Sequence, residues 1–120
     1  MNENRKNKDD ILDGAFWANE LQFAITVTDI NDTIIYMNKK SKRSYPNAKI
    51  GDNLAGCHKQ ISMDKVEEFK KNDVSNTYTV QKNGIKKLIH QTPWYKNGKI
   101  AGLAEFSIEI PFEIPHIIRD

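Results

Sequence analysis

The last third of the chain alternates apolar and polar positions in three runs, which are separated by Asn83-Gly84 and Asn97-Gly98. Asn and Gly both tolerate positive φ, which the type I′ turn of a two-residue hairpin requires. Residues 77–110 are therefore predicted to form an antiparallel meander of three strands. Because turn length fixes strand register, the two turns also predict which side chains share a face of the sheet.

With two-residue loops at both turns, Tyr78 is expected opposite Ile89, and Ile89 opposite Phe106. Gln91 is then expected opposite Ala104, and His90 opposite Glu105. One face of the meander is predicted to be the core face, and it holds Tyr78, Val80, Ile85, Ile89, Gln91, Pro93, Ala104, Phe106, Ile108 and Ile110. The other face is half polar, and it holds Thr77, Thr79, Leu88, His90, Thr92, Trp94, Ala101, Leu103, Glu105 and Ser107.

The first half of the chain predicts a helix, a strand pair and shorter helices. Apolar residues recur at helical spacing over residues 10–21, which indicates an amphipathic helix. Residues 23–28 and 33–37 are rich in β-branched residues on either side of a polar turn, so they are expected to pair as strands. Asn38 is a candidate N-cap for a short helix over residues 39–44, and a further helix is expected over residues 64–71. The result is an α+β domain with a five-stranded antiparallel sheet, short helices on one face and the N-terminal helix on the other.

Composition narrows the class of protein. A chain of 120 residues has room for one modest core, and its net charge of +2 is too small to indicate nucleic acid. One cysteine, Cys57, excludes an internal disulfide and favours a reducing cytoplasm. There is no apolar run of about 20 residues, so no membrane span is expected. Residues 1–9 are expected to be frayed, 10–21 to form the cap helix, 22–110 the core domain and 111–120 an extended arm.

Three segments carry a resemblance to a known family. The segment "VTDINDTIIYMNKKS" resembles the opening of a PAS domain, and "KIGDNL" resembles the helical connector of that family. The segment "KNGIKKLIHQTPWYKNGKIAGLAEFSIEI" resembles its last two strands. The resemblance spans Leu12 to Ile110. It implies a stand-alone sensory or interaction module, not an enzyme, that binds a ligand between sheet and helices and dimerises through its N-terminal helix.

A ligand pocket is predicted on the core face because Gln91 is polar among apolar neighbours, and a few polar groups in an apolar cavity orient a small molecule. The alternative is that Gln91 satisfies a backbone group in a filled core. The pocket candidates are Ile25, Val27, Met37, Val66, Phe69, Tyr78, Ile89, Gln91 and Phe106.

A partner surface is predicted on the other face, where apolar side chains need cover from the N-terminal helix or from a second chain. The pair His90 and Glu105 is either a pH-sensitive interface contact or a structural hydrogen bond. The interface candidates are Leu12, Phe16, Leu88, His90, Trp94, Leu103 and Glu105.

Cofactor chemistry has little support in the sequence. Cys57-His58 has no further Cys or His at ligand spacing, so no metal site is expected. The residues around Cys57 depart from the motif of flavin-binding PAS photosensors, and the predicted helix over residues 64–71 lacks the histidine of haem-binding PAS sensors. No particular cofactor is indicated, and no cluster of titratable groups points to catalysis. The prediction is a cytoplasmic, homodimeric sensory module with a small ligand or a signalling partner, and the alternative is a ligand-free dimerisation module with a filled core.

Overall fold

The computed structural model describes residues 16–54, 68, 71 and 74–120 of the chain. Predictions that concern other residues lie outside this range. They include most of the helix expected over residues 10–21, the pocket candidates Val66 and Phe69, the interface candidate Leu12, and Cys57-His58. Of the helix expected over residues 64–71, Glu68 and Lys71 are described, and both are helical.

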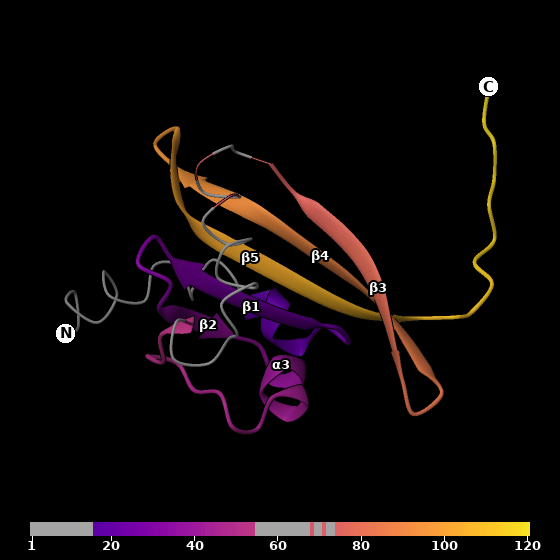
Figure 1. The fold of residues 1–120 in the computed structure, drawn as a ribbon, viewed down its shortest axis with the longest axis horizontal. Coiled ribbons are helices and arrows are strands. Elements are labelled where there is room, and N and C mark those ends of the chain that lie inside the picture. The colour runs from indigo at the N-terminus through magenta and orange to yellow at the C-terminus, as the bar shows by residue number, and fades with distance from the viewer. Residues whose placement is uncertain (1–15, 55–67, 69–70, 72–73) are drawn as a thin grey trace.

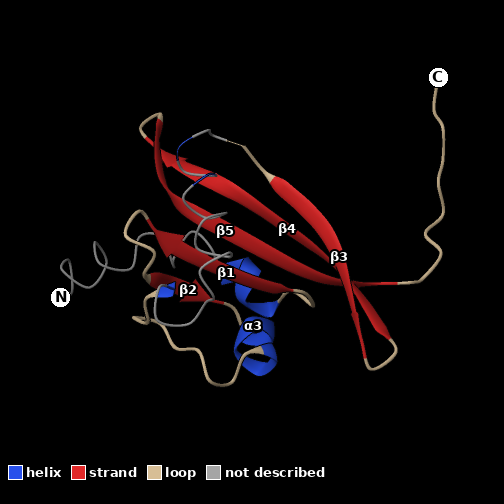
Figure 2. Cartoon of the chain, viewed as in Figure 1, coloured by secondary structure: helices blue, strands red, loops and turns tan. Residues whose placement is uncertain are grey.

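The fold is a five-stranded antiparallel sheet with few helices (Figures 1 and 2). In chain order its elements are η1 (Phe16–Glu20, a 3-10 helix), β1 (Ala24–Asp29), β2 (Ile34–Met37), α3 (Lys39–Ser44), β3 (Asn76–Lys82), β4 (Ile85–Lys96) and β5 (Lys99–Ile110). The strand order is β2-β1-β5-β4-β3. The predicted fold class is therefore confirmed, and β4 and β5, at 12 residues each, form the long centre of the sheet.

Both Asn-Gly pairs form the predicted two-residue loops. Asn83 and Asn97 each have φ 54°, and Gly84 and Gly98 each have φ 78°. Positive φ at both central positions is what a type I′ turn requires. The first turn also gives the predicted register, with Tyr78 opposite Ile89.

The register between β4 and β5 differs from the prediction by one residue. Tyr95 pairs with Ile100 next to the turn, but Trp94 pairs with Gly102, so Ala101 is an extra residue on β5. This β-bulge shifts every later pair. Because side chains alternate between faces along a strand, it also reverses the faces of β5 relative to those predicted from turn length.

Two predicted pairs are therefore wrong. Glu105 lies opposite Gln91 and not opposite His90, whose partner is Phe106. Ile89 lies opposite Ser107. The predicted core-face residues of β5, Ala104 and Phe106 among them, thus lie on the face opposite to Gln91.

The bulge lies next to a close approach of β1, β4 and β5. A Cβ atom on Gly102 would lie 1.9 Å from the carbonyl oxygen of Thr28 and 2.8 Å from Trp94 Nε1. Trp94 Nε1 donates a hydrogen bond of 2.8 Å to that same carbonyl oxygen. A glycine is required here because any side chain would collide with the β1 backbone.

The two faces of the sheet are distinguished by what covers them. Thr26 pairs with Glu105 and its hydroxyl lies 2.6 Å from that of Ser41, so α3 lies on the face of Glu105, here called the inner face. Ile25 pairs with Phe106 on the opposite, outer face. There Ala18 of η1 packs with Ile25 and Tyr36, and the partly buried residues around them are Leu21, Phe23, Val27 and Phe106.

Asn38, which lies between β2 and α3, connects these elements to η1 and β1 by hydrogen bonds. Its side chain is fully buried and uses its whole hydrogen-bonding capacity. Oδ1 accepts from the backbone N–H groups of Ile25 (3.0 Å) and Ser41 (2.9 Å). Nδ2 donates to the carbonyl oxygens of Ala18 (2.9 Å) and Phe23 (2.8 Å). The predicted N-cap is confirmed, and the same side chain also joins η1, β1 and α3.

Candidate functional site

The inner face carries a chain of three polar side chains at its centre. Gln91 Nε2 donates a hydrogen bond of 2.9 Å to Glu105 Oε2, and Asn76 Nδ2 donates one of 3.3 Å to Gln91 Oε1. A carboxylate oxygen can only accept, so Gln91 must present its NH₂ group to Glu105 and its oxygen to Asn76. All three side chains are half-buried. At the Glu105 end an acceptor is left over, because Glu105 Oε1 receives no hydrogen bond from a described residue.

The charge of this carboxylate acts on two tyrosines, Tyr45 and Tyr78. Burial raises the pKa of the Tyr45 phenol, the negative charge of Glu105 raises it further, and the Ser107 hydroxyl partly offsets the rise. Burial, Glu105 and Tyr45 raise the pKa of the Tyr78 phenol in the same order. Tyr45 is the C-cap residue of α3, whereas Tyr78 is on β3. The polar cluster of Glu105, Gln91, Tyr45 and Tyr78 therefore combines residues from different elements of the inner face. Both phenols are thus neutral at neutral pH.

Ser107 adds a buried hydroxyl to the same cluster. It lies two residues after Glu105 on β5, which places it on the same face, and it is 5% exposed. Its Oγ makes no hydrogen bond of regular geometry with a described residue, although it lies close enough to Tyr45 to affect the phenol. A buried hydroxyl without a partner is uncommon in native proteins and calls for an explanation.

The predicted pocket residues divide between the two faces. Met37, Tyr78, Ile89 and Gln91 lie on the inner face. Ile25, Val27 and Phe106 do not share that face. They lie on the outer face, where the rings of Phe23 and Phe106 have centroids 6.1 Å apart. The apolar side of β1 faces η1, and its threonines face the polar cluster.

The predicted interface residues divide in the same way. Leu88, His90 and Trp94 lie on the outer face, whereas Leu103 and Glu105 lie on the inner face. Phe16 is on η1 and is 75% exposed. The proposed contact between His90 and Glu105 does not form. The His90 ring nitrogen Nδ1 instead lies 2.7 Å from the hydroxyl of Thr77 on β3.

Sequence reasoning missed Tyr45, Asn76 and Ser107 as members of the site, and it placed Glu105 on the wrong face. One signal was available, because an isolated glycine inside a strand pattern indicates a bulge or a close backbone approach. Gly102 is such a glycine. Tyr45 had no comparable signal, since only the tertiary structure brings the end of α3 to the sheet.

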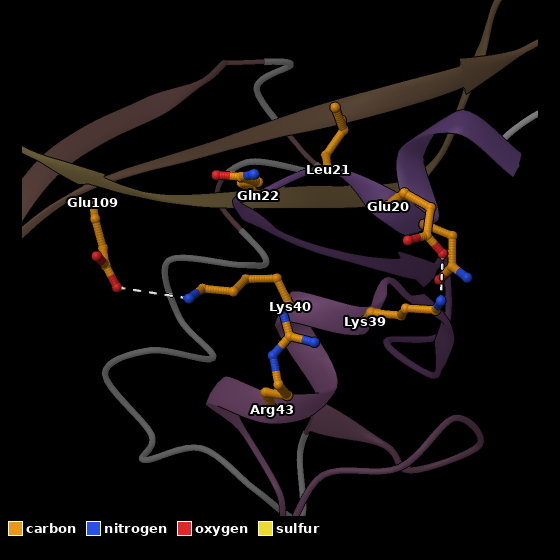
Figure 3. A pocket seen from close by; sticks show the side chains of 8 residues that line it. Glu20, Leu21, Gln22, Lys39, Lys40, Arg43 and Glu109 are labelled. Carbon is orange, nitrogen blue, oxygen red and sulfur yellow. Dashed lines mark ion pairs between the residues drawn. The ribbon is translucent and has the colours of Figure 1, made fainter.

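A polar cleft of about 400 Å³ lies between η1, α3 and the end of β5 (Figure 3). Its cationic side chains come from α3, where Lys39 pairs with Glu20 and Lys40 lies 3.8 Å from Glu109. The side chains of Lys39, Glu20 and Glu109 are more than half exposed, and that of Lys40 is 31% exposed. Ion pairs of this kind contribute little to stability, and they leave the cleft with nearly balanced charge.

Metal-binding and membrane-spanning features are absent from the part of the chain that the structure describes. There, no three His, Cys, Asp or Glu side chains are grouped as a metal ion would need. No helix among the same residues has the length and apolar character that crossing a membrane requires.

No family model and no curated protein matches the sequence, but solved structures match the fold. The PAS domain of a protein from Colwellia psychrerythraea is 25% identical, with a TM-score of 0.59 over 83% of this chain and 97% of that one. A sensory box sensor histidine kinase from Vibrio cholerae is 14% identical, with a TM-score of 0.60 over 92% and 97%. VqmA bound to DPO is 17% identical, with a TM-score of 0.62 over 82% of this chain and 57% of VqmA. The chain therefore has the PAS fold, which confirms the resemblance found in the sequence.

Proposed function

We propose that this PAS-fold chain is a sensory or signalling module that binds a small molecule on the inner face of its sheet. The observation that carries the proposal is the polar cluster of Glu105, Gln91, Tyr45, Tyr78 and Ser107. A few polar groups among apolar side chains are typical of sites that orient a small ligand. The cluster also contains the buried Ser107 hydroxyl, which makes no hydrogen bond of regular geometry with a described residue and which a ligand would satisfy.

The similar structures support a sensory role of this kind. They include a sensory box sensor histidine kinase and VqmA bound to DPO. Fold alone is a weak argument for function, so the proposal depends on the cluster and not on these proteins.

Asn38 suggests how occupancy of the inner face would reach the rest of the molecule. Ser41 is on α3 and contacts inner-face Thr26 through its hydroxyl, while its backbone N–H is bound by Asn38. The other half of the Asn38 amide binds the Ala18 carbonyl of η1. A ligand that shifts α3 relative to the sheet would therefore change the packing of η1, and the population of η1 arrangements would report binding.

Native mass spectrometry of the full chain, purified from its own host without denaturation, tests this proposal. The expected spectrum contains a species heavier than the polypeptide, and the excess mass is lost under denaturing conditions. The same measurement on an Ile89→Trp variant, which fills the inner face beside Ser107, should show no excess mass. A bare polypeptide mass for the wild-type chain would contradict the proposal.

A second candidate is a ligand-free interaction module that acts through its N-terminal segment. The specific observation in its favour is the exposure of two adjacent aromatic side chains on η1, Phe16 at 75% and Trp17 at 59%. Large exposed aromatic groups are enriched at protein interfaces. A homodimer in the native spectrum together with a bare polypeptide mass would favour this candidate over the first.

A further inference from the structure

We infer that the inner face selects a small, planar ligand that carries N–H or ammonium hydrogen-bond donors, and that Glu105 is the group that binds them. The inference rests on the proposed function and names the chemical class of the ligand. It depends on Glu105, whose carboxylate can only accept hydrogen bonds and takes part in no ion pair with a described residue.

The three hydrogen-bonded side chains Asn76, Gln91 and Glu105 leave a carboxylate oxygen unused on the inner face. Glu105 Oε2 accepts from Gln91, whereas Oε1 accepts nothing from a described residue. Asn76 donates one of its two N–H groups to Gln91, so its other N–H and its carbonyl oxygen stay available. A ligand that donates hydrogen bonds would complement Glu105 Oε1, and one that only accepts would leave this oxygen unsatisfied.

The charge of Glu105 is not balanced within the described residues. The ion pairs there involve Glu20 and Glu109, and none involves Glu105. Its neighbours on the inner face include buried apolar side chains, Ile89 and Leu103. A half-buried carboxylate in such surroundings is stabilised by a cation or by several donors, and it repels an anion.

The tyrosines and the apolar side chains set the shape of the ligand. The charge of Glu105 acts on Tyr45 and Tyr78, which are neutral phenols, so nearby hydroxyls can either donate or accept and ring faces can attract a cation. The buried Ser107 supplies a further hydroxyl, while the buried side chains of Met37 and Ile89 make the surroundings apolar. A flat ring with an amidine, amide or amino group satisfies both kinds of contact.

Three probes with the same ring but different head groups test the inference. Benzamidine is a cation with paired N–H donors at neutral pH, benzamide is a neutral donor, and benzoate is an anion without donors. Each is titrated into the ¹⁵N-labelled full chain, and dissociation constants are taken from amide shifts of inner-face residues. Benzamidine is expected to bind at least tenfold more tightly than benzoate, with benzamide between them.

Glu105→Gln should abolish this tenfold preference. Glu109→Gln provides the matched control, because it removes a carboxylate from the same strand, and it should leave the order of the probes unchanged. If Glu105→Gln does not fold, as judged by loss of dispersed amide signals, Glu105→Asp retains the charge and should retain the preference.

The outcomes separate the inference from the proposed function. Equal binding of the probes, tighter binding of benzoate, or an unchanged order in Glu105→Gln would overturn the inference. Recovery of a native ligand without N–H donors would do the same, while the proposed function would stand. Failure of all three probes, together with a bare native mass, would overturn both.

Discussion

Gln91 and Glu105 lie opposite each other on β4 and β5, and the Gln91 amide donates a hydrogen bond of 2.9 Å to the carboxylate. The pair forms because Ala101 is an extra residue on β5. Without that bulge, turn length would place Ala104 opposite Gln91. A single inserted residue therefore determines whether a carboxylate lies among the tyrosines of the inner face or on the opposite side of the sheet.

Replacement of Asn38 by alanine is expected to lower the free energy of unfolding by about 3 kcal/mol, since it removes an N-cap and leaves buried backbone groups without partners. Urea denaturation followed by circular dichroism measures the change. Asn47→Ala is the control, because Asn47 is exposed and an exposed substitution costs within about 0.5 kcal/mol. Similar losses in both variants would show that the four hydrogen bonds of Asn38 are unimportant.

Gly102→Ala is expected to destabilise the chain by about 3 kcal/mol or more, because the new Cβ would overlap the Thr28 carbonyl oxygen at 1.9 Å. Gly84→Ala is the matched comparison. At Gly84 a Cβ has open space and meets only the penalty of positive φ, roughly 1–2 kcal/mol. The two variants are compared by thermal and urea unfolding. A Gly102→Ala protein as stable as Gly84→Ala would argue against the close approach of β1 and β5.

Because of Tyr45 and Tyr78, the free energy of unfolding is expected to depend on pH in the alkaline range. Both phenols have a folded-state pKa above the ordinary value of 10.0. Their contribution to stability is therefore fully present below pH 10.0 and is lost as the pH rises through the folded-state pKa. Urea denaturation at a series of pH values should show the free energy of unfolding falling above pH 10.0.

Glu105→Gln is expected to lower the pKa of Tyr45 and of Tyr78 without returning either to 10.0, since burial is the largest cause of each rise. Titration of ¹³C-labelled tyrosine by NMR measures both values. Tyr36 is an internal control, because burial alone raises its pKa. An equal shift at Tyr36, or none at Tyr45 and Tyr78, would contradict the electrostatic effect of Glu105 on the two phenols.

Phe16→Ser is expected to weaken self-association if η1 forms the dimer contact, because it removes a large exposed aromatic group. Analytical ultracentrifugation would detect at least a tenfold rise in the dissociation constant of the dimer. Ile50→Ser is the control, since Ile50 is 50% exposed but lies in the turn after α3. An equal effect of both substitutions would exclude η1 as a specific contact.

Local signals predicted the fold well. The two Asn-Gly turns, the strand pair before Asn38 and the N-cap all depend on short-range backbone preferences, and the structure has each of them. The PAS resemblance rested on the same segments. Site assignment failed where it depended on counting residues along β5, because counting assumes an unbroken ladder and Gly102 marks a break.

The sequence by itself determined the strands, their antiparallel order around the two turns and the capped helix after β2, because each depends on residues near one another in the chain. The tertiary structure decided which face is which. The close approach of Thr28, Trp94 and Gly102 places the bulge, and the bulge turns Glu105 toward Gln91, Tyr45 and Tyr78. These residues are far apart in sequence, so only packing between strands could bring them together.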